Sequence, residues 1–318
     1  MILTFAPMEG VTGHVYRRVH AKMFGGADRY YSPFIAPDSA GAFKAGNLRD
    51  VLPENNEGVT LIPQILANRS EAFLAVARTL ADMGYEEVNL NVGCPSGTVV
   101  AKHKGSGMLT DLRSLDDFLA DVFSLCPIAV SVKTRMGIRS TEEFGKILEI
   151  YDKYPISELI VHARDREGMY KSTPDISAFK AAFSSGRGNM TYNGNIFSSA
   201  DLERVKAAVP GLGSFMVGRG CAADPALLRE LRGGRPPEKE ELREFHDVLV
   251  SETLSSGLAE NFTVSRMKEL WFYMGCLFPD GKKALREINK SRSMSDYRSA
   301  VGLLFSIGGF DGSARFPG

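Results

Sequence analysis

The sequence predicts an α/β fold followed by an all-helical region, and three observations support this prediction. Short apolar strand patterns alternate with amphipathic helical patterns from residue 3 to residue 231. A stretch rich in glycine and proline at residues 232–237 is typical of a linker. Only helical patterns follow it. We therefore expect two domains, at residues 1–234 and 235–318.

Eight segments of the first region have the length and composition of strands. They lie at residues 3–8, 29–35, 60–66, 87–93, 128–135, 158–164, 189–195 and 214–218. Helices are expected between most of them, for example at 70–84, where a glycine ends the pattern, and at 141–155 and 198–210, where a proline does. Eight β/α units fit a closed parallel barrel better than an open doubly wound sheet. The predicted fold is a (β/α)8 TIM barrel followed by a smaller C-terminal all-helical domain.

The composition argues against several classes of protein. With 38 basic and 38 acidic side chains in 318 residues, the net charge neither favours nor excludes a polyanionic partner. The four cysteines have no paired spacing, which argues against a disulfide framework or a zinc site. There is no signal-peptide pattern, and no apolar run approaches the ~20 residues of a membrane span. We expect a cytoplasmic monomer with no metal and no membrane contact.

Polar residues or glycines close nearly every predicted strand. They are Pro7, Met8 and Glu9; Gln64; Asn91 and Cys94; Lys133 and Arg135; His162 and Arg164; Asn193 and Asn195; and Gly218 with Arg219. In a parallel barrel the carboxyl ends of all strands meet on one face, so these residues should converge. Taken singly, Lys133 could be a solvated or paired surface group, and His162 could be a buried histidine whose hydrogen bonds are all made within the core. Their recurrence at successive strand ends indicates an active site.

The segment at residues 87–95 carries the strongest chemical signal. It alternates like a strand, with Asn89 and Asn91 on one face. Gly93 permits a sharp turn and Pro95 fixes the backbone, so Cys94 lies where the strand ends. Most free cysteines are small buried hydrophobes, and the other three here are interpreted in that way. Cys94 is the candidate for chemistry.

The last two strands suggest a phosphate site. Residues 190–195 and 215–220 each end in a glycine-containing turn, and the second should lead into a helix that begins near Asp224. Barrels commonly bind phosphate with these loops, where free N–H groups and a helix N-terminus attract anions. Arg219 could add a bidentate contact, and Lys133 could neutralise an electron-rich heterocycle. The alternative is that the glycines only make tight turns.

The C-terminal region is predicted to be helical at residues 239–255, 262–278, 281–289 and 295–305. Between residues 266 and 298 it has eight basic and four acidic side chains, with Trp271, Phe272 and Tyr273 among them. This pattern could contact a phosphodiester backbone, and an ordinary solvated face over an aromatic core explains it equally well. The glycine-rich residues 308–318 are expected to form a flexible tail.

These motifs together resemble the tRNA-dihydrouridine synthases over essentially the whole chain. The Asn-x-Gly-Cys-Pro stretch at 91–95, followed by the loop at 102–109, is the most specific part. The other matching segments are residues 6–12, 63–64, 132–135, 161–164 with Arg166 and Tyr170, 193–195, 218–220 and 266–268. The resemblance implies a barrel that binds FMN at its mouth, a helical domain that holds tRNA, and NADPH as the transient reductant.

The resemblance also implies roles for individual residues. The residues expected around the flavin ring and its ribityl chain are Pro7, Met8, Glu9, Gln64, Lys133 and His162. Those expected at its phosphate end are Asn193, Gly194, Asn195, Gly218 and Arg219. Asn91 would contact the uracil, and Arg164 and Arg166 would face the RNA. Three positions depart from the family pattern: Glu9 replaces a small residue, Gly13 an aspartate, and Asn195 the last residue of Asn-Gly-Asp.

The implied reaction is the reduction of the C5=C6 bond of uridine to 5,6-dihydrouridine. A flavin can supply only the hydride, so Cys94 would protonate C5. A thiol with a pKa near ~8.5 is mostly protonated at neutral pH and can act as a general acid. Two alternatives remain. One is a flavin barrel that acts on a small molecule such as a dihydropyrimidine or an enone, and the other is a non-catalytic RNA-binding protein with a structural flavin.

Overall fold

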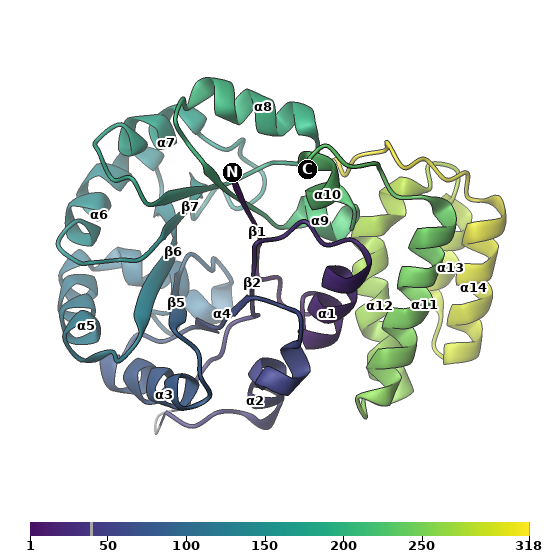
Figure 1. The fold of residues 1–318 in the computed structure, drawn as a ribbon, viewed down its shortest axis with the longest axis horizontal. Coiled ribbons are helices and arrows are strands. Elements are labelled where there is room, and N and C mark those ends of the chain that lie inside the picture. The colour runs from purple at the N-terminus through teal and green to yellow at the C-terminus, as the bar shows by residue number, and fades with distance from the viewer. Residues whose placement is uncertain (39–40, 318) are drawn as a thin grey trace.

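The computed structural model describes residues 1–38 and 41–317, and all strands in this part of the chain run parallel in one sheet. The strands are β1 (Ile2–Phe5), β2 (Arg29–Tyr31), β3 (Leu61–Ile62), β4 (Gln64–Ile65), β5 (Glu87–Val92), β6 (Ala129–Gly137), β7 (Leu159–Asp165), β8 (Met190–Asn193) and β9 (Ser214–Val217). Their order in the sheet is β3-β2-β1-β9-β8-β7-β6-β5-β4. Figure 1 shows this sheet curved into a barrel with helices outside it. The predicted TIM barrel is confirmed.

The barrel closes at Pro63. The predicted third strand is split there into β3, which pairs with β2, and β4, which pairs with β5. Proline has no N–H to donate to a sheet, which explains the break. Its carbonyl oxygen still accepts a bond of 2.9 Å from the backbone N–H of Asn89. The two half-strands therefore occupy one position, and the sheet has the eight positions that the sequence predicts.

Helices fill the connections around the barrel. They are α1 (His14–Met23), α2 (Ala45–Val51), α3 (Ser70–Asp82), α4 (Gly97–Val100), α5 (Leu112–Leu125), α6 (Phe144–Tyr151), α7 (Ile176–Phe183), α8 (Ser199–Ala208), α9 (Arg219–Ala223) and α10 (Leu227–Leu231). Short 3-10 turns precede or join some of them: η1 (Pro53–Asn56), η2 (Gly105–Thr110) and η3 (Thr141–Glu143).

Local sequence explains most helix boundaries, with one exception. In α3, Phe73, Ala77 and Leu80 are buried on one face, and Gly84 at φ +92° ends the segment. The helix expected near Asp224 is present as α10, which begins at Leu227. The sequence did not indicate the short helix α9, which begins at Arg219 directly after Gly218. The chain therefore enters a helical turn sooner after β9 than its glycines and proline suggest.

The C-terminal region consists of α11 (Lys239–Ser255), α12 (Glu260–Met274), η4 (Gly275–Leu277), α13 (Lys282–Lys290) and α14 (Met294–Ile307). Figure 1 shows these helices stacked on the side of the barrel that carries α1, α9 and α10. The Phe245 ring of α11 lies 5.7 Å from that of Tyr16 and 5.1 Å from that of Phe24. The two regions therefore share a hydrophobic core. The domain boundary at 234/235 stays a prediction.

No described helix is both long and apolar enough to cross a membrane. Within the same residues, no group of three or more His, Cys, Asp or Glu side chains is arranged to hold a metal ion.

Candidate active site at the carboxyl ends of the strands

A pocket of about 80 Å³ opens at the carboxyl ends of β1, β6, β7, β8 and β9. Nine of the predicted site residues line it: Pro7, Met8, Lys133, His162, Arg164, Asn193, Gly194, Gly218 and Arg219. The remaining lining residues are Ala6, Tyr170, Phe197 and Gly220. The predicted convergence of strand ends is therefore present for these nine residues. A pocket of this size can hold a phosphate group, so a larger ligand must extend out of it.

The pocket is strongly cationic. Burial, followed by the charge of Arg135, lowers the pKa of Lys133 to about 7. Burial and then Arg219 and Arg135 lower the pKa of Arg164 to about 10. None of the lining residues is acidic. The cations depress one another's pKa values because no carboxylate of the lining compensates them, which is the arrangement expected of a site for an anion.

His162 is neutral in this environment. Its pKa lies well below the ordinary value, first because of burial and then because of the surrounding cations. Nη1 of Arg164 lies 3.0 Å from Nε2 of His162, and a guanidinium can only donate. Nε2 must therefore be the acceptor, and the ring proton is on Nδ1. His162 can offer one N–H to a ligand.

Two asparagines hold the cationic side chains in position. Nζ of Lys133 donates to Oδ1 of Asn193 over 2.9 Å. Oδ1 of Asn195 accepts from Nη2 of Arg164 over 3.0 Å and from Nη2 of Arg219 over 2.8 Å. The Arg219 guanidinium also lies 4.4 Å from the centre of the Tyr170 ring. Asn195 does not line the pocket, but it aligns two arginines that do.

Cys94 is held in a fixed turn beside this pocket. Its backbone N–H donates to Oδ1 of Asn91 over 2.9 Å, and its carbonyl oxygen accepts from the backbone N–H and the hydroxyl of Ser106. Gly105 lies directly behind it at φ +56°, and a Cβ there would be 2.8 Å from the Cys94 carbonyl oxygen. Nε of Arg135 donates to the carbonyl oxygen of Gly93 over 2.9 Å. The thiol is half-buried and its turn is fixed on both sides.

The same surroundings keep the Cys94 thiol protonated. Burial raises its pKa above the ordinary value, and the Ser96 backbone N–H, Arg135 and Lys133 oppose this only in part. A thiol in this state can donate a proton at neutral pH.

Asn91 and Gln64 lie beneath Cys94. Nδ2 of Asn91 donates to Oε1 of Gln64 over 2.7 Å, and Nε2 of Gln64 donates to Oδ1 of Asn89 over 2.8 Å. The side chain of Gln64 has 0% of its surface exposed, and it does not line the pocket. Its contact with a flavin stays a prediction.

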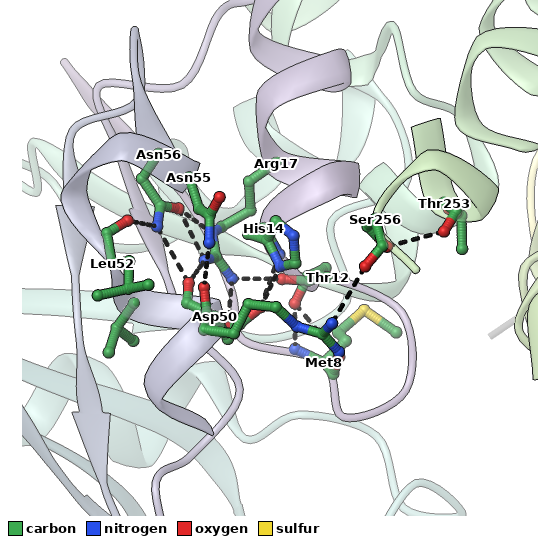
Figure 2. Close-up of polar contacts among 12 residues, drawn as sticks. Met8, Thr12, His14, Arg17, Asp50, Leu52, Asn55, Asn56, Thr253 and Ser256 are labelled. Carbon is green, nitrogen blue, oxygen red and sulfur yellow. Dashed lines mark hydrogen bonds and ion pairs between the residues drawn. The ribbon is translucent and has the colours of Figure 1, made fainter. Parts of the chain in front are cut away.

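The loop after β1, which carries Pro7 and Met8, is fixed by a buried arginine. Thr12 Oγ1 accepts from the backbone N–H of Met8 over 2.8 Å, and Nη1 of Arg17 donates to the Thr12 carbonyl oxygen over 2.7 Å. Figure 2 shows Arg17 between Asp50 and Asn56, with both of which it bonds. The Arg17 charge holds the pKa of Asp50 below its usual value, against the effect of burial. This network ties the loop after β1 to the segment around α2.

Two further predicted residues, Glu9 and Arg166, do not line the pocket. Glu9 is exposed, and its pKa is raised by partial desolvation and then by the carboxylate of Asp50. Arg166 pairs with its neighbour Glu167, with 3.7 Å between Nη2 and Oε1. Neither lines the pocket, so their roles toward flavin and RNA stay predictions.

Sequence reasoning assigned no role to three residues that shape the site. Arg135, which the sequence marks only as a strand end, binds the Cys94 turn and the carbonyl oxygen of Asp165. Tyr170, which the sequence marks only as part of a motif, and Phe197, which no motif includes, both line the pocket. The position of Phe197, two residues after Asn195, was the available signal.

The dihydrouridine synthase (Dus) family model matches residues 4–292, which is most of the chain and includes all these site residues. The chain belongs to the dihydrouridine synthase family. The match includes the barrel strands and the cysteine turn, while residues 293–318 lie outside it.

Curated relatives of this family member carry the same kind of name. The chain is 29% identical over 250 residues to a tRNA-dihydrouridine(16) synthase from Cupriavidus necator, covering 75% of this chain and 76% of that one. It is 30% identical over 240 residues to a tRNA-dihydrouridine(16) synthase from Ralstonia nicotianae, with coverage of 73% and 72%. It is 26% identical over 231 residues to tRNA-dihydrouridine synthase B from Shewanella oneidensis, with coverage of 72% and 70%.

Solved structures support the fold of this dihydrouridine synthase family member. The old yellow enzyme from Trypanosoma cruzi superposes with a TM-score of 0.52 at 9% identity, covering 74% of this chain and 89% of that one. Morphinone reductase gives a TM-score of 0.51 at 12% identity, with coverage of 75% and 87%. At these identities the likeness concerns the barrel alone.

A lysine cluster adjoins the cysteine turn. Lys102 and Lys104 belong to the loop that leads to Gly105, and Lys44 precedes α2. Burial and then the charges of Lys102 and Lys44 lower the pKa of Lys104. Three cations that repel one another beside the site form a surface suited to an anionic partner.

Proposed function

We propose that this protein reduces the C5=C6 bond of specific uridines in tRNA to 5,6-dihydrouridine, with bound FMN, NADPH as electron donor and Cys94 as proton donor. The observation that carries the proposal is a cysteine whose backbone is held by Asn91 and Ser106, with a thiol pKa raised by burial, beside a cationic pocket whose lining has no carboxylate. The family membership and the names of the relatives support the same reaction.

The residues present fit FMN. The phosphate needs an anion site, and Arg219 supplies charge where Gly194 and Gly218 leave the backbone bare. A Cβ at Gly218 would lie 3.2 Å from that of Ala6, so a side chain there would narrow the pocket. Asn193 would complete the phosphate end, with Asn195 holding Arg219 in place. Bound FMN would supply the hydride.

The ring of FMN would extend from the phosphate pocket toward Cys94. Pro7 and Met8 would support it on one side, and Lys133 and His162 would lie near its polar edge. The pKa of Lys133 is about 7, so its amine can be neutral or charged near neutral pH. Lys133 would therefore be charged when the flavin ring is anionic and could be neutral when the ring is neutral. Gln64 and Glu9 complete the set of residues that we propose to contact FMN. Gln64 would approach it from the barrel interior beneath Cys94, and Glu9 from the loop after β1.

Cys94 would donate its proton to C5 of the uracil while C6 receives the hydride. Asn91 is suited to orient the base. Its amide carries two N–H donors, of which Gln64 accepts one, so the second could reach a uracil carbonyl. The target base would leave its stack to enter the site, which costs least for a nucleotide in a loop.

The RNA would lie across the mouth of the barrel. Arg164 and Arg166 would face it from β7 and the loop that follows, and the lysine cluster of Lys44, Lys102 and Lys104 would contact phosphates beside the cysteine turn. The helical region would hold the rest of the tRNA. We also propose that the protein works in the cytoplasm, because tRNA and a reduced thiol are both expected there.

The test measures dihydrouridine in tRNA that lacks the modification, after incubation with purified protein, FMN and NADPH. A Cys94→Ala variant should retain FMN and form little product, whereas Cys126→Ala, a matched change of a cysteine outside the site, should form normal amounts. If NADPH bleaches the flavin but tRNA does not re-oxidise it, the proposal fails and a small-molecule acceptor is favoured.

A further inference from the structure

We propose that the C-terminal tail, residues 308–317, is a structural part of the active site, in which Arg315 anchors the tail and Phe316 is a positioning residue for Phe197 and Arg219. The inference rests on the proposed function for the identity of the ligand, FMN. It concerns a segment outside the family match, which ends at residue 292.

The tail returns from the helical region to the barrel. Figure 1 shows the chain running back from α14 along the top of the helical region toward α9 and α10. The backbone N–H of Asp311 donates to the carbonyl oxygen of Leu277 over 2.9 Å, and the Phe310 ring lies 5.6 Å from that of Phe278. The tail is therefore bonded along its path before it reaches the barrel.

Arg315 anchors the tail on two carboxylates that the barrel buries. Its Nη1 lies 3.3 Å from Oδ2 of Asp224 and its Nη2 lies 2.9 Å from Oε2 of Glu230. Asp224 is only 3% exposed, and burial and then its interaction with Glu230 raise its pKa above the ordinary value. Arg229 forms its side-chain ion pair with Glu241, although its charge also acts on Asp224 and Glu230. Arg315 is thus the arginine that pairs directly with this acidic pair and helps to offset its charge.

Phe316 lies next to the pocket wall. Its ring is 6.0 Å from that of Phe197, 5.8 Å from that of Phe272 and 5.4 Å from that of Tyr273. Phe272 is a large apolar residue, yet 68% of its surface is exposed to solvent even with Phe316 in place. The four rings come from the loop after β8, from α12 and from the tail. Phe316 therefore joins the barrel to the helical region at this point.

The pocket side of Phe197 faces the phosphate end of the site. The Arg219 guanidinium contacts two rings, 5.4 Å from the centre of Phe197 and 4.4 Å from that of Tyr170. A cation over an aromatic face is held by the ring quadrupole. Phe316 packs against the Phe197 ring, which also contacts Arg219, so loss of Phe316 frees Phe197 to move and loosens the position of Arg219.

This arrangement predicts a selective effect on the phosphate group. The affinity for FMN should fall when Phe316 is removed, whereas the affinity for riboflavin, which has the same ring and no phosphate, should not. A general loosening of the fold would weaken both ligands alike. The comparison of the two flavins therefore separates positioning from simple destabilisation.

The experiment titrates the full-length flavin-free protein with FMN and with riboflavin, followed by flavin fluorescence, for the native chain, Phe316→Ala and Arg315→Met. Phe262→Ala, at an exposed phenylalanine on α12, is the matched control. We expect Phe316→Ala to raise the Kd for FMN by about three- to tenfold, the size of a typical coupling between neighbouring residues. The Kd for riboflavin should change by less than about twofold. Arg315→Met should act in the same direction, and Arg315→Lys should restore part of the affinity.

Two results would overturn the inference. One is unchanged FMN affinity in Phe316→Ala, and the other is an equal loss of FMN and riboflavin affinity. If the native chain itself binds no FMN, the proposed function fails, and the inference, which rests on it, fails with it. The native titration therefore distinguishes the two failures.

Discussion

The backbone N–H of Cys94 donates to Oδ1 of Asn91, and this bond fixes the orientation of the amides beneath the thiol. An N–H can only donate, so Nδ2 of Asn91 must face Gln64, whose Oε1 accepts. Nε2 of Gln64 then donates to Asn89, and Nδ2 of Asn89 donates to Ser131. The position of the thiol is thus supported by a chain of oriented hydrogen bonds through the barrel interior.

Breaking this chain should cost stability. Asn89→Ala removes the acceptor for Gln64 and the donor to Ser131, both buried, and should lower the free energy of unfolding by about 1–3 kcal/mol, the cost of an unsatisfied buried polar group. Asn55→Ala, which removes an exposed bond to the Arg49 carbonyl oxygen, should cost much less. Urea denaturation of both variants measures the difference, and equal losses would contradict the role given to Asn89.

Product formation should continue to alkaline pH and then fall. Burial raises the pKa of the Cys94 thiol, so its proton is retained beyond the ordinary cysteine range and lost only as pH rises through the raised value. Single-turnover re-oxidation of the reduced protein by tRNA, measured from pH 6 to 10, checks this. Cys126→Ser should leave the profile unchanged. A fall in rate below pH 8 that followed a thiol titration would be inconsistent with Cys94 as the acid.

FMN affinity should depend on the charge of Lys133. Its pKa is about 7 in the free protein, and a bound anion should raise it. Affinity should then be constant below pH 7 and decrease as pH rises from 7 toward the raised value, by at most about tenfold per unit. Lys133→Met should bind FMN more weakly at pH 6 and show a flatter profile between pH 6 and 9. Lys146→Met, at an exposed lysine on α6, is the control, and a steep profile in Lys133→Met would refute the assignment.

The lysine cluster should control the salt dependence of tRNA binding. Each neutralised phosphate contributes about 0.7–0.9 to the slope of log K against log salt, so replacing Lys44, Lys102 and Lys104 by alanine should reduce that slope by up to about 3. Filter binding at several salt concentrations measures it. A triple alanine variant of the exposed residues Lys22, Lys180 and Lys206 should keep the native slope. If both triple variants behave alike, the cluster makes no specific contact.

The sequence predicts which residues lie at the carboxyl ends of the strands, but it does not predict which of their side chains point into the pocket. Met8 and Glu9 are adjacent at the end of β1, and Met8 lines the pocket while Glu9 is exposed. Arg164 and Arg166 are similarly close, and only Arg164 reaches the pocket. Near a strand end the backbone leaves its regular alternation, so a side chain's direction depends on loop bonds such as those of Thr12 and Arg17.

Long-range partners were also beyond the reach of sequence patterns. Arg315 pairs with Asp224 and Glu230, which are 91 and 85 residues earlier in the chain. Nothing local marks such a pair, and the surrounding glycines suggested a flexible tail. The prediction of a flexible tail stays a prediction. The described residues of the tail make the contacts given above.

The sequence by itself determined the positions of the strands and most helices, the barrel, the helical region after it, and the turn that places Cys94 at the end of β5. These follow from local periodicity and turn chemistry, which act over a few residues. Only the tertiary structure decided that Pro63 closes the barrel, that the lining cations are left without a carboxylate, and that Phe316 supports the pocket wall. Those features depend on side chains from distant segments meeting in space, where burial and charge then set their properties.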